Sequence, residues 1–175
     1  MKLSEIKNGE WVVIDTGILV YANQQKCPEC IQLLKRCALR EVRGLVPMPV
    51  VAELVHTLML IEARENKWIE PSASLGGRRL SSAHALTERP ELVRRLSRYE
   101  NQVREFLGIG LRLEPATHVD FLEAMSLQRE FGLLTNDALL LAIARRLNCS
   151  AIASRDKAFG VVKGFVVYQP SELEG

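Results

Sequence analysis

The sequence predicts an α/β fold of three layers, with a mainly parallel sheet of about five strands covered by helices on both faces. Short apolar runs alternate along the chain with longer segments of helical periodicity, which is the pattern of a parallel sheet buried on both sides. The chain has 175 residues, of which 47% are hydrophobic and 25% charged, so it can bury a core of its own. We find no internal repeat and no clear boundary, and we expect a single domain over residues 1–175.

The expected strands are five short apolar segments. They lie at residues 11–15, 44–48, 111–114, 150–154 and 165–168. The first of them, Trp11-Val-Val-Ile-Asp15, ends in a carboxylate that is followed at once by Thr16 and Gly17, a sequence typical of turns. Because burying an unpaired charge is costly, an apolar strand with an aspartate at its end needs an explanation.

The expected helices fill the intervals between these strands. They lie at about residues 23–39, 49–65, 90–107, 118–131 and 135–144. Pro49 suits the first position of its helix. Thr135 or Asn136 can cap the last helix, whose apolar residues run almost all round it and therefore require burial on most sides. The segment 66–89 is rich in Ser, Gly and Ala, and we expect an inserted loop or short helix there.

Charge and hydropathy restrict the classes of function. The net charge is only +2, so nucleic-acid binding would depend on local patches and not on a polybasic tail. No apolar run approaches the roughly 18 residues that suggest a membrane span. Residues 1–11 are polar and charged and lack the apolar region of a signal peptide. We therefore expect a soluble, cytoplasmic protein that does not contact a membrane.

The cysteines favour packing over metal binding or redox chemistry. Cys27-Pro-Glu-Cys30 is a CxxC pair, which could form half of a zinc site or a redox pair. No second pair and no suitably spaced histidine completes a zinc site. Cys27, Cys30 and Cys37 instead share one helical face with apolar residues, so we interpret them as part of the core.

Four acidic residues that are distant in the sequence are expected to meet at one edge of the sheet. Asp15 ends the first strand, and Asp156 directly follows the strand at 150–154. Glu53 lies early in the helix after the second strand, and Asp137 lies in the first turn of the buried helix. The carboxyl ends of parallel strands share this edge with the N-termini of the following helices, and open α/β sheets bind their ligands there.

Such a cluster of carboxylates predicts a divalent metal site. Without a cation, like charges raise one another's pKa values and oppose folding, and a helix N-terminus offsets only about 0.3–1 kcal/mol. Hard carboxylate oxygens suit one or two Mg²⁺ or Mn²⁺ ions, to which Thr16 and Ser154 could add hydroxyl contacts. A metal held by few protein groups lowers the pKa of a bound water and stabilises charge on a phosphodiester. Glu53 or Asp137 could accept the proton of that water.

The segments that carry the acids also resemble a known family. They read, in order, VIDTGILVYA, PVVAEL, TNDALLLAIA and SRDKAF, and together they resemble the PIN-domain nucleases, most closely the VapC-like toxins. The resemblance implies an endoribonuclease that depends on Mg²⁺ or Mn²⁺ and leaves 5′-phosphate and 3′-hydroxyl ends. It assigns both metal binding and catalysis to the four acids, Asp15, Glu53, Asp137 and Asp156.

The same resemblance implies protein partners. One is a small antitoxin whose tail covers the acidic cleft, and the other is a second copy of the chain, with the helices at 23–39 and 49–65 as candidate interfaces. The chain departs from many relatives at Pro47-Met48-Pro49, where they have a serine, and at Ala158, where they have another acid. These departures bear on the number of metal ions. The segment 66–89 is longer than in compact VapC-like toxins, which bears on substrate choice.

Basic residues near the expected acidic edge and in the insertion are candidate contacts for the phosphate backbone of RNA. They are Arg78, Arg79, Arg155 and Lys157. The arginines of the helix at 90–107 have the simpler interpretation of a solvated helix face. No aromatic stacking platform is evident beside these candidates.

Two other functions are compatible with parts of the pattern. A PIN-like fold with an inactive site would be an RNA- or protein-binding module, although the presence of all four acids argues against it. A phosphatase or phosphotransferase of the haloacid-dehalogenase type also places an aspartate after the first strand. That class normally has a second aspartate two positions later, where this chain has Gly17. Taken singly, each acid also has a structural interpretation as a turn, cap or solvated residue.

Overall fold

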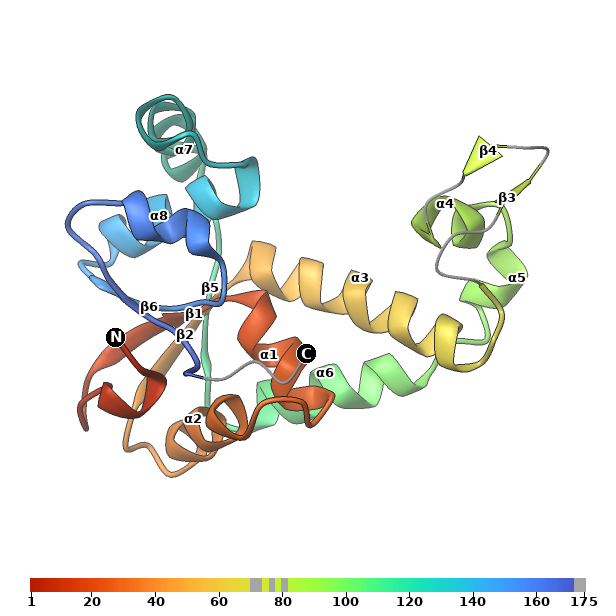
Figure 1. Cartoon of the computed structure of the whole chain (residues 1–175), viewed down its shortest axis with the longest axis horizontal. Helices are drawn as coiled ribbons and strands as arrows, with labels where there is room; N and C mark the ends of the chain where they lie inside the picture. The colour runs from red at the N-terminus through yellow and green to blue at the C-terminus, as the bar shows by residue number, and fades with distance from the viewer. Residues whose placement is uncertain (70–73, 76–77, 80–81, 172–175) are drawn as a thin grey trace.

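A five-stranded sheet forms the centre of the computed structural model, which describes residues 1–69, 74–75, 78–79 and 82–171 (Figure 1). For 74–75, 78–79 and 82 only the backbone is described. The strands are β1 (Trp11–Ile14), β2 (Arg43–Pro47), β5 (Arg112–Glu114), β6 (Ala151–Ala153) and β7 (Val166–Tyr168). Their order across the sheet is β5-β2-β1-β6-β7, and every neighbouring pair is parallel. The predicted α/β class and parallel sheet are confirmed.

Helices cover the sheet on two sides. They are α1 (Thr16–Asn23), α2 (Pro28–Ala38), α3 (Met48–Glu65), α4 (Ser82–Thr87), α5 (Pro90–Val93), α6 (Arg98–Gly108), α7 (His118–Phe131) and α8 (Thr135–Arg146), with 3₁₀ turns at Leu3–Glu5 and Lys157–Val161. Figure 1 shows α7 and α8 on one side of the sheet and α1 and α2 on the other. None of the helices in the described part of the chain is long and apolar enough to cross a membrane.

The core lies where α8 and α2 meet the sheet. Residues 138–144 of α8 are all buried, which confirms that this helix is enclosed on most sides. The central strand β1 is likewise inaccessible over residues 12–14. All four cysteines are free and buried in this core, as the packing interpretation predicts.

The helix expected at 23–39 corresponds to α2, and a separate helix that was not predicted, α1, precedes it. The carboxylate of Asp15 accepts a hydrogen bond from the backbone N–H of Thr16, so Asp15 is the N-cap of α1 and the helix begins directly after β1. Helix α2 starts separately at Pro28, a favoured residue for the first turn. Of the two interpretations of Asp-Thr-Gly, a turn is wrong and a helix cap is confirmed, because Asp15 directly follows β1 and caps α1.

The helix expected at 90–107 is divided, into α5 and α6. The buried side chain of Glu62, from α3, accepts hydrogen bonds from the backbone N–H groups of Ser97, Arg98 and Tyr99 at 3.0, 3.2 and 2.9 Å. A carboxylate from another helix thus satisfies the free N–H groups at the start of α6. Helix α6 therefore begins at the residues whose N–H groups Glu62 binds.

Helix α3 extends well beyond the sheet and supports a second, smaller apolar cluster at its far end (Figure 1). The buried members of this cluster come from the end of α3 and from the segments around α4 and α5. They are Ala63, Ile69, Ala85, Leu86 and Leu96. The region 66–89, expected to be a loop or short helix, contains α4 and a short antiparallel hairpin of β3 (Ser74–Leu75) and β4 (Arg78–Arg79).

Candidate active site

Asp15 is held in place at the carboxyl end of β1 by two donors. Ser154 Oγ donates to Oδ2 at 2.6 Å, and the backbone N–H of Thr16 donates to Oδ1 at 2.7 Å. Burial raises the pKa of the Asp15 carboxyl above its usual value, and the nearby Glu53 and Asp156 add to this increase. The two hydrogen bonds act in the opposite direction, because they stabilise the ionised form. The net result is an anion whose charge is poorly compensated.

Ser154 connects Asp15 to Asp156. It is completely buried, and its hydroxyl accepts a hydrogen bond from the backbone N–H of Asp156 at 3.0 Å while donating to Asp15. Asp156 in turn accepts from the backbone N–H of Ala158 at 2.7 Å, which fixes the start of the following 3₁₀ turn. The hydroxyl of Thr16 is buried and donates to the carbonyl of Val50 at 3.4 Å. That hydrogen bond joins α1 to α3.

Glu53 and Asp137 complete the group of acids from two other helices. Glu53 lies near the start of α3 and is exposed, and its Oε2 accepts a hydrogen bond from Asn136 Nδ2 at 3.2 Å. Asp137 lies in the first turn of α8. Burial, followed by the charges of Asp15, Asp156 and Glu53, raises the pKa of Asp137 from 3.8 to about 6. Asp15 and Asp137 are therefore each close enough to the other acids to be affected by their charges.

All four acids line one open cavity of about 440 Å³. The described residues that share its wall with them are Thr16, Gly17, Val20, Tyr21, Thr57 and Arg155. The four acids, which are distant in the sequence and were expected to meet at one edge of the sheet, thus share one cavity. Hard oxygen donors and repelling charges fit a divalent cation. Among the side chains that the structure describes, however, no three acidic, histidine or cysteine groups converge in a metal-binding arrangement.

Arg155 gives the cavity its one described guanidinium. The guanidinium lies over the ring of Tyr21, 3.3 Å from its centroid, and its buried Nε has no hydrogen-bond partner. It forms no ion pair with the acids beside it among the residues described. Burial lowers the pKa of Arg155 from its usual value. The guanidinium of Arg155 therefore faces the cavity without an ion pair to its acids among the residues described.

The other basic candidates differ in position. Lys157 is exposed, at the start of the 3₁₀ turn after Asp156. Arg78 and Arg79 belong to the hairpin beyond α3, and their side chains lie outside the described residues. Sequence reasoning missed Tyr21 and Asn136. Tyr21 is four residues after Gly17, which would have placed it on the same face had α1 been foreseen.

The sequence of the chain matches a model of the PIN domain over residues 12–164. This match covers all four acids and most of the chain. The chain belongs to the PIN domain family. No functionally curated protein matches the sequence at a significant level.

Two solved structures resemble this PIN domain closely in fold. One is the crystal structure of VapBC2 from Rickettsia felis bound to a DNA fragment from their promoter, with a TM-score of 0.60 and 13% identity, covering 91% of this chain and 98% of the other. The second is a toxin-antitoxin complex from Klebsiella pneumoniae, with a TM-score of 0.56 and 15% identity, covering 89% of this chain and 95% of the other. At such low identity the likeness shows a shared fold.

The raised pKa of Asp137 leads to a prediction for the PIN domain in EDTA. Because the folded state binds this proton more tightly than the unfolded state, unfolding becomes easier as the pH rises from about 4 to about 6. Asp137→Asn removes this penalty, and we expect it to increase the free energy of unfolding above pH 6 by on the order of 1 kcal/mol, a value reduced for partial exposure.

Thermal melts at pH 4 and pH 8 measure this effect. We expect Asp137→Asn to melt about 2–4 °C higher than the wild type at pH 8 and to show no gain at pH 4. Glu130→Gln, at an exposed position on α7, is the matched control and is expected to change neither melt. An equal gain at both pH values would contradict the proposed repulsion at Asp137.

Proposed function

We propose that this PIN domain is a metal-dependent endoribonuclease that hydrolyses RNA phosphodiester bonds. The main support is that Asp15, Glu53, Asp137 and Asp156, from four separate parts of the sequence, line a single cavity. The carboxylates destabilise one another there, which is expected of a site that is completed by cations. One or two Mg²⁺ or Mn²⁺ ions are the proposed cofactor, with these four acids as the proposed ligands.

The residues of the cavity have distinct proposed roles. Ser154 and the backbone of Thr16 fix the orientation of Asp15. Asp137, with a pKa of about 6, is largely ionised at neutral pH and is suited to accept a proton from an attacking water. Arg155 faces the same cavity and attracts an RNA phosphate. A bound divalent ion would supply a water of lowered pKa and would offset charge on the phosphodiester.

We further propose that the protein is the toxin of a VapBC-type pair. Its fold resembles chains in two toxin-antitoxin complexes, which supports an antitoxin partner for this chain. A basic side chain of such a partner would be attracted to the acids of the cavity. A homodimer, with α2 and α3 as candidate interfaces, is also part of the proposal. A short reading frame for a DNA-binding protein directly before the gene would support the toxin role.

The test is cleavage of a labelled single-stranded RNA by the purified protein. We expect cleavage with Mn²⁺ or Mg²⁺, none with EDTA, recovery when metal is restored, and products with 5′-phosphate ends. The metals alone are also expected to raise the melting temperature of the wild type, because they bind only the folded state. A folded protein that cuts no RNA with either ion would support the alternative, an inactive PIN-like module that binds RNA or protein.

A further inference from the structure

A basic and aromatic cluster lies at the amino edge of the sheet, at the opposite end of β1 from Asp15. Trp11 begins β1 and is 37% exposed. Arg43 is its direct neighbour on β2, and Arg112 lies on the next strand, β5. The guanidinium carbons of Arg43 and Arg112 lie 5.7 and 5.6 Å from the centre of the indole ring. The proposed function uses none of these residues.

The cluster opens into a cavity of about 380 Å³, within the range of small-molecule sites. Its polar wall consists of Arg40, Arg43 and Arg112, and Trp11 supplies the aromatic wall. Arg40 lies in the turn after α2 and has a left-handed backbone conformation, with a φ of +59°. Three strongly basic groups and one flat ring therefore face a common space.

The positive charge of this cavity is largely uncompensated. Arg112 contacts Glu114 at 3.2 Å, but Glu114 is shared with Arg146, which approaches it to 2.8 Å. Within the described part of the chain, the side chains of Arg40 and Arg43 have no hydrogen bond or ion pair. These arginines are held beside an exposed tryptophan without an acidic partner. An anion that also carries a flat ring would satisfy both groups.

We propose that this cavity binds a nucleoside phosphate, with its base against Trp11 and its phosphate against Arg40 and Arg43. Stacking on an aromatic side chain suits every base, and arginine binds phosphate through paired N–H groups. The guanidiniums of Arg43 and Arg112 lie over the indole, so a base that stacks on Trp11 takes their place against the ring. A small inorganic anion would not account for the exposed indole.

Two sources would supply the same chemistry, a free nucleotide or one nucleotide of a single RNA strand. A strand would use the cavity as a second contact, away from the acids at the other edge. The proposal does not depend on the proposed nuclease activity, since Trp11 and Asp15 lie at opposite ends of one strand. Binding can therefore be measured in EDTA, where the acids are not expected to cut RNA.

The experiment titrates the folded protein in EDTA with AMP and, separately, with a short oligoadenylate. In a Trp68→Phe background the indole fluorescence reports on Trp11 alone, and we expect saturable quenching by at least one ligand. Much tighter binding of the oligoadenylate would identify an RNA strand as the source. Equal affinity of the two ligands would identify the free nucleotide. Absence of saturable quenching by either ligand would overturn the proposal.

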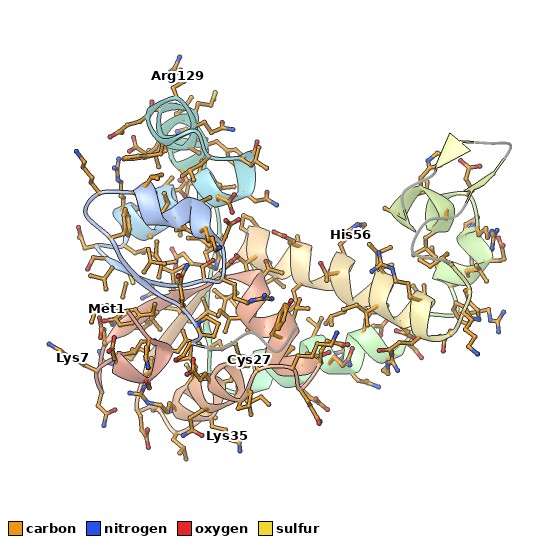
Figure 2. The ribbon with its side chains drawn as sticks, viewed as in Figure 1. Met1, Lys7, Cys27, Lys35, His56 and Arg129 are labelled. Carbon is orange, nitrogen blue, oxygen red and sulfur yellow. The ribbon has the colours of Figure 1, made fainter. Side chains whose placement is uncertain are left out.

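Variants then test which side chains are used, with affinity read from the anisotropy of labelled ligand. Trp11→Leu is expected to weaken binding about tenfold. The double variant Arg40→Gln/Arg43→Gln is expected to weaken it as strongly and, for the oligoadenylate, to reduce the slope of log K against log[salt] by about 0.7, the value for one phosphate. Arg129→Gln, at the outer end of α7, is the matched control (Figure 2). Affinities equal to that of the control, in variants with unchanged circular dichroism, would refute the site.

Discussion

Asp15→Asn is expected to reduce metal-dependent cleavage of RNA by about 10²–10³-fold. Asp15 is the acid that is most firmly held, because Ser154 and the backbone of Thr16 each bind one of its oxygens. It also acts electrostatically on Asp137. An amide keeps the shape of the side chain but removes the negative charge that the proposed cation requires.

The same substitution is expected to leave the fold intact. Each oxygen of the Asp15 carboxylate accepts one hydrogen bond, and the amide nitrogen that replaces one of them cannot accept. The loss of that hydrogen bond costs about 1 kcal/mol. Burial, however, opposes the charged form of Asp15, and removing the charge relieves that penalty. We therefore expect a circular dichroism spectrum and a melting temperature close to those of the wild type in EDTA.

The measurement compares initial cleavage rates of the two proteins with Mn²⁺, at equal concentration and purified in parallel. Glu130→Gln, which removes an acid outside the cavity, is expected to cut RNA like the wild type. A folded Asp15→Asn variant that retains full activity would show that a contaminant or a different site cuts the RNA. Such a result would refute the assignment of Asp15 and leave the fold unaffected.

The sequence predicts the placement of the acids because it depends on topology alone. In a parallel α/β sheet, a residue directly after a strand and a residue in the first turn of the next helix share one edge. Asp15 directly follows β1 and Asp137 lies in the first turn of α8. Asp156 lies three residues after β6 and Glu53 lies in the second turn of α3, close enough to reach the same edge. These positions follow from local apolar periodicity, which a single sequence contains.

The contacts that orient the acids depend on tertiary structure and were not predictable. The dual hydrogen bonding of Ser154 requires knowledge that β1 and β6 are neighbours, and the stacking of Arg155 requires the position of α1. The break before α6 has the same origin, because Glu62 lies 35 residues before Ser97. Periodicity cannot show where a distant carboxylate will cap a helix.

Arg146→Met is expected to destabilise the protein by about 3–5 kcal/mol, the cost of leaving the buried carboxylate of Asp120 without its cation and Glu114 with Arg112 alone. Arg146, at the end of α8, donates from Nε to Asp120 and from Nη1 to Glu114, each at 2.8 Å. It also donates to the carbonyl of Pro115 at 3.0 Å. Asp120 is only 2% exposed and Glu114 only 8%, so neither can recover these contacts from water. Urea unfolding at pH 7 measures the loss.

The pH dependence of this loss separates charge from packing. Burial alone would raise the pKa of Asp120, but hydrogen bonds from Arg146 and Thr117 outweigh it and lower the pKa below 3.8. The stabilisation is therefore complete above about pH 4 and decreases as the pH falls through the lowered pKa. In Arg146→Met, protonation relieves the unpaired carboxylate of Asp120, so the difference from the wild type should shrink in acid.

Arg145→Met, whose partner Glu123 is solvent-exposed, should cost at most about 1 kcal/mol at any pH. Equal losses in the two variants would show that the Asp120 and Glu114 contacts contribute no more than a surface ion pair.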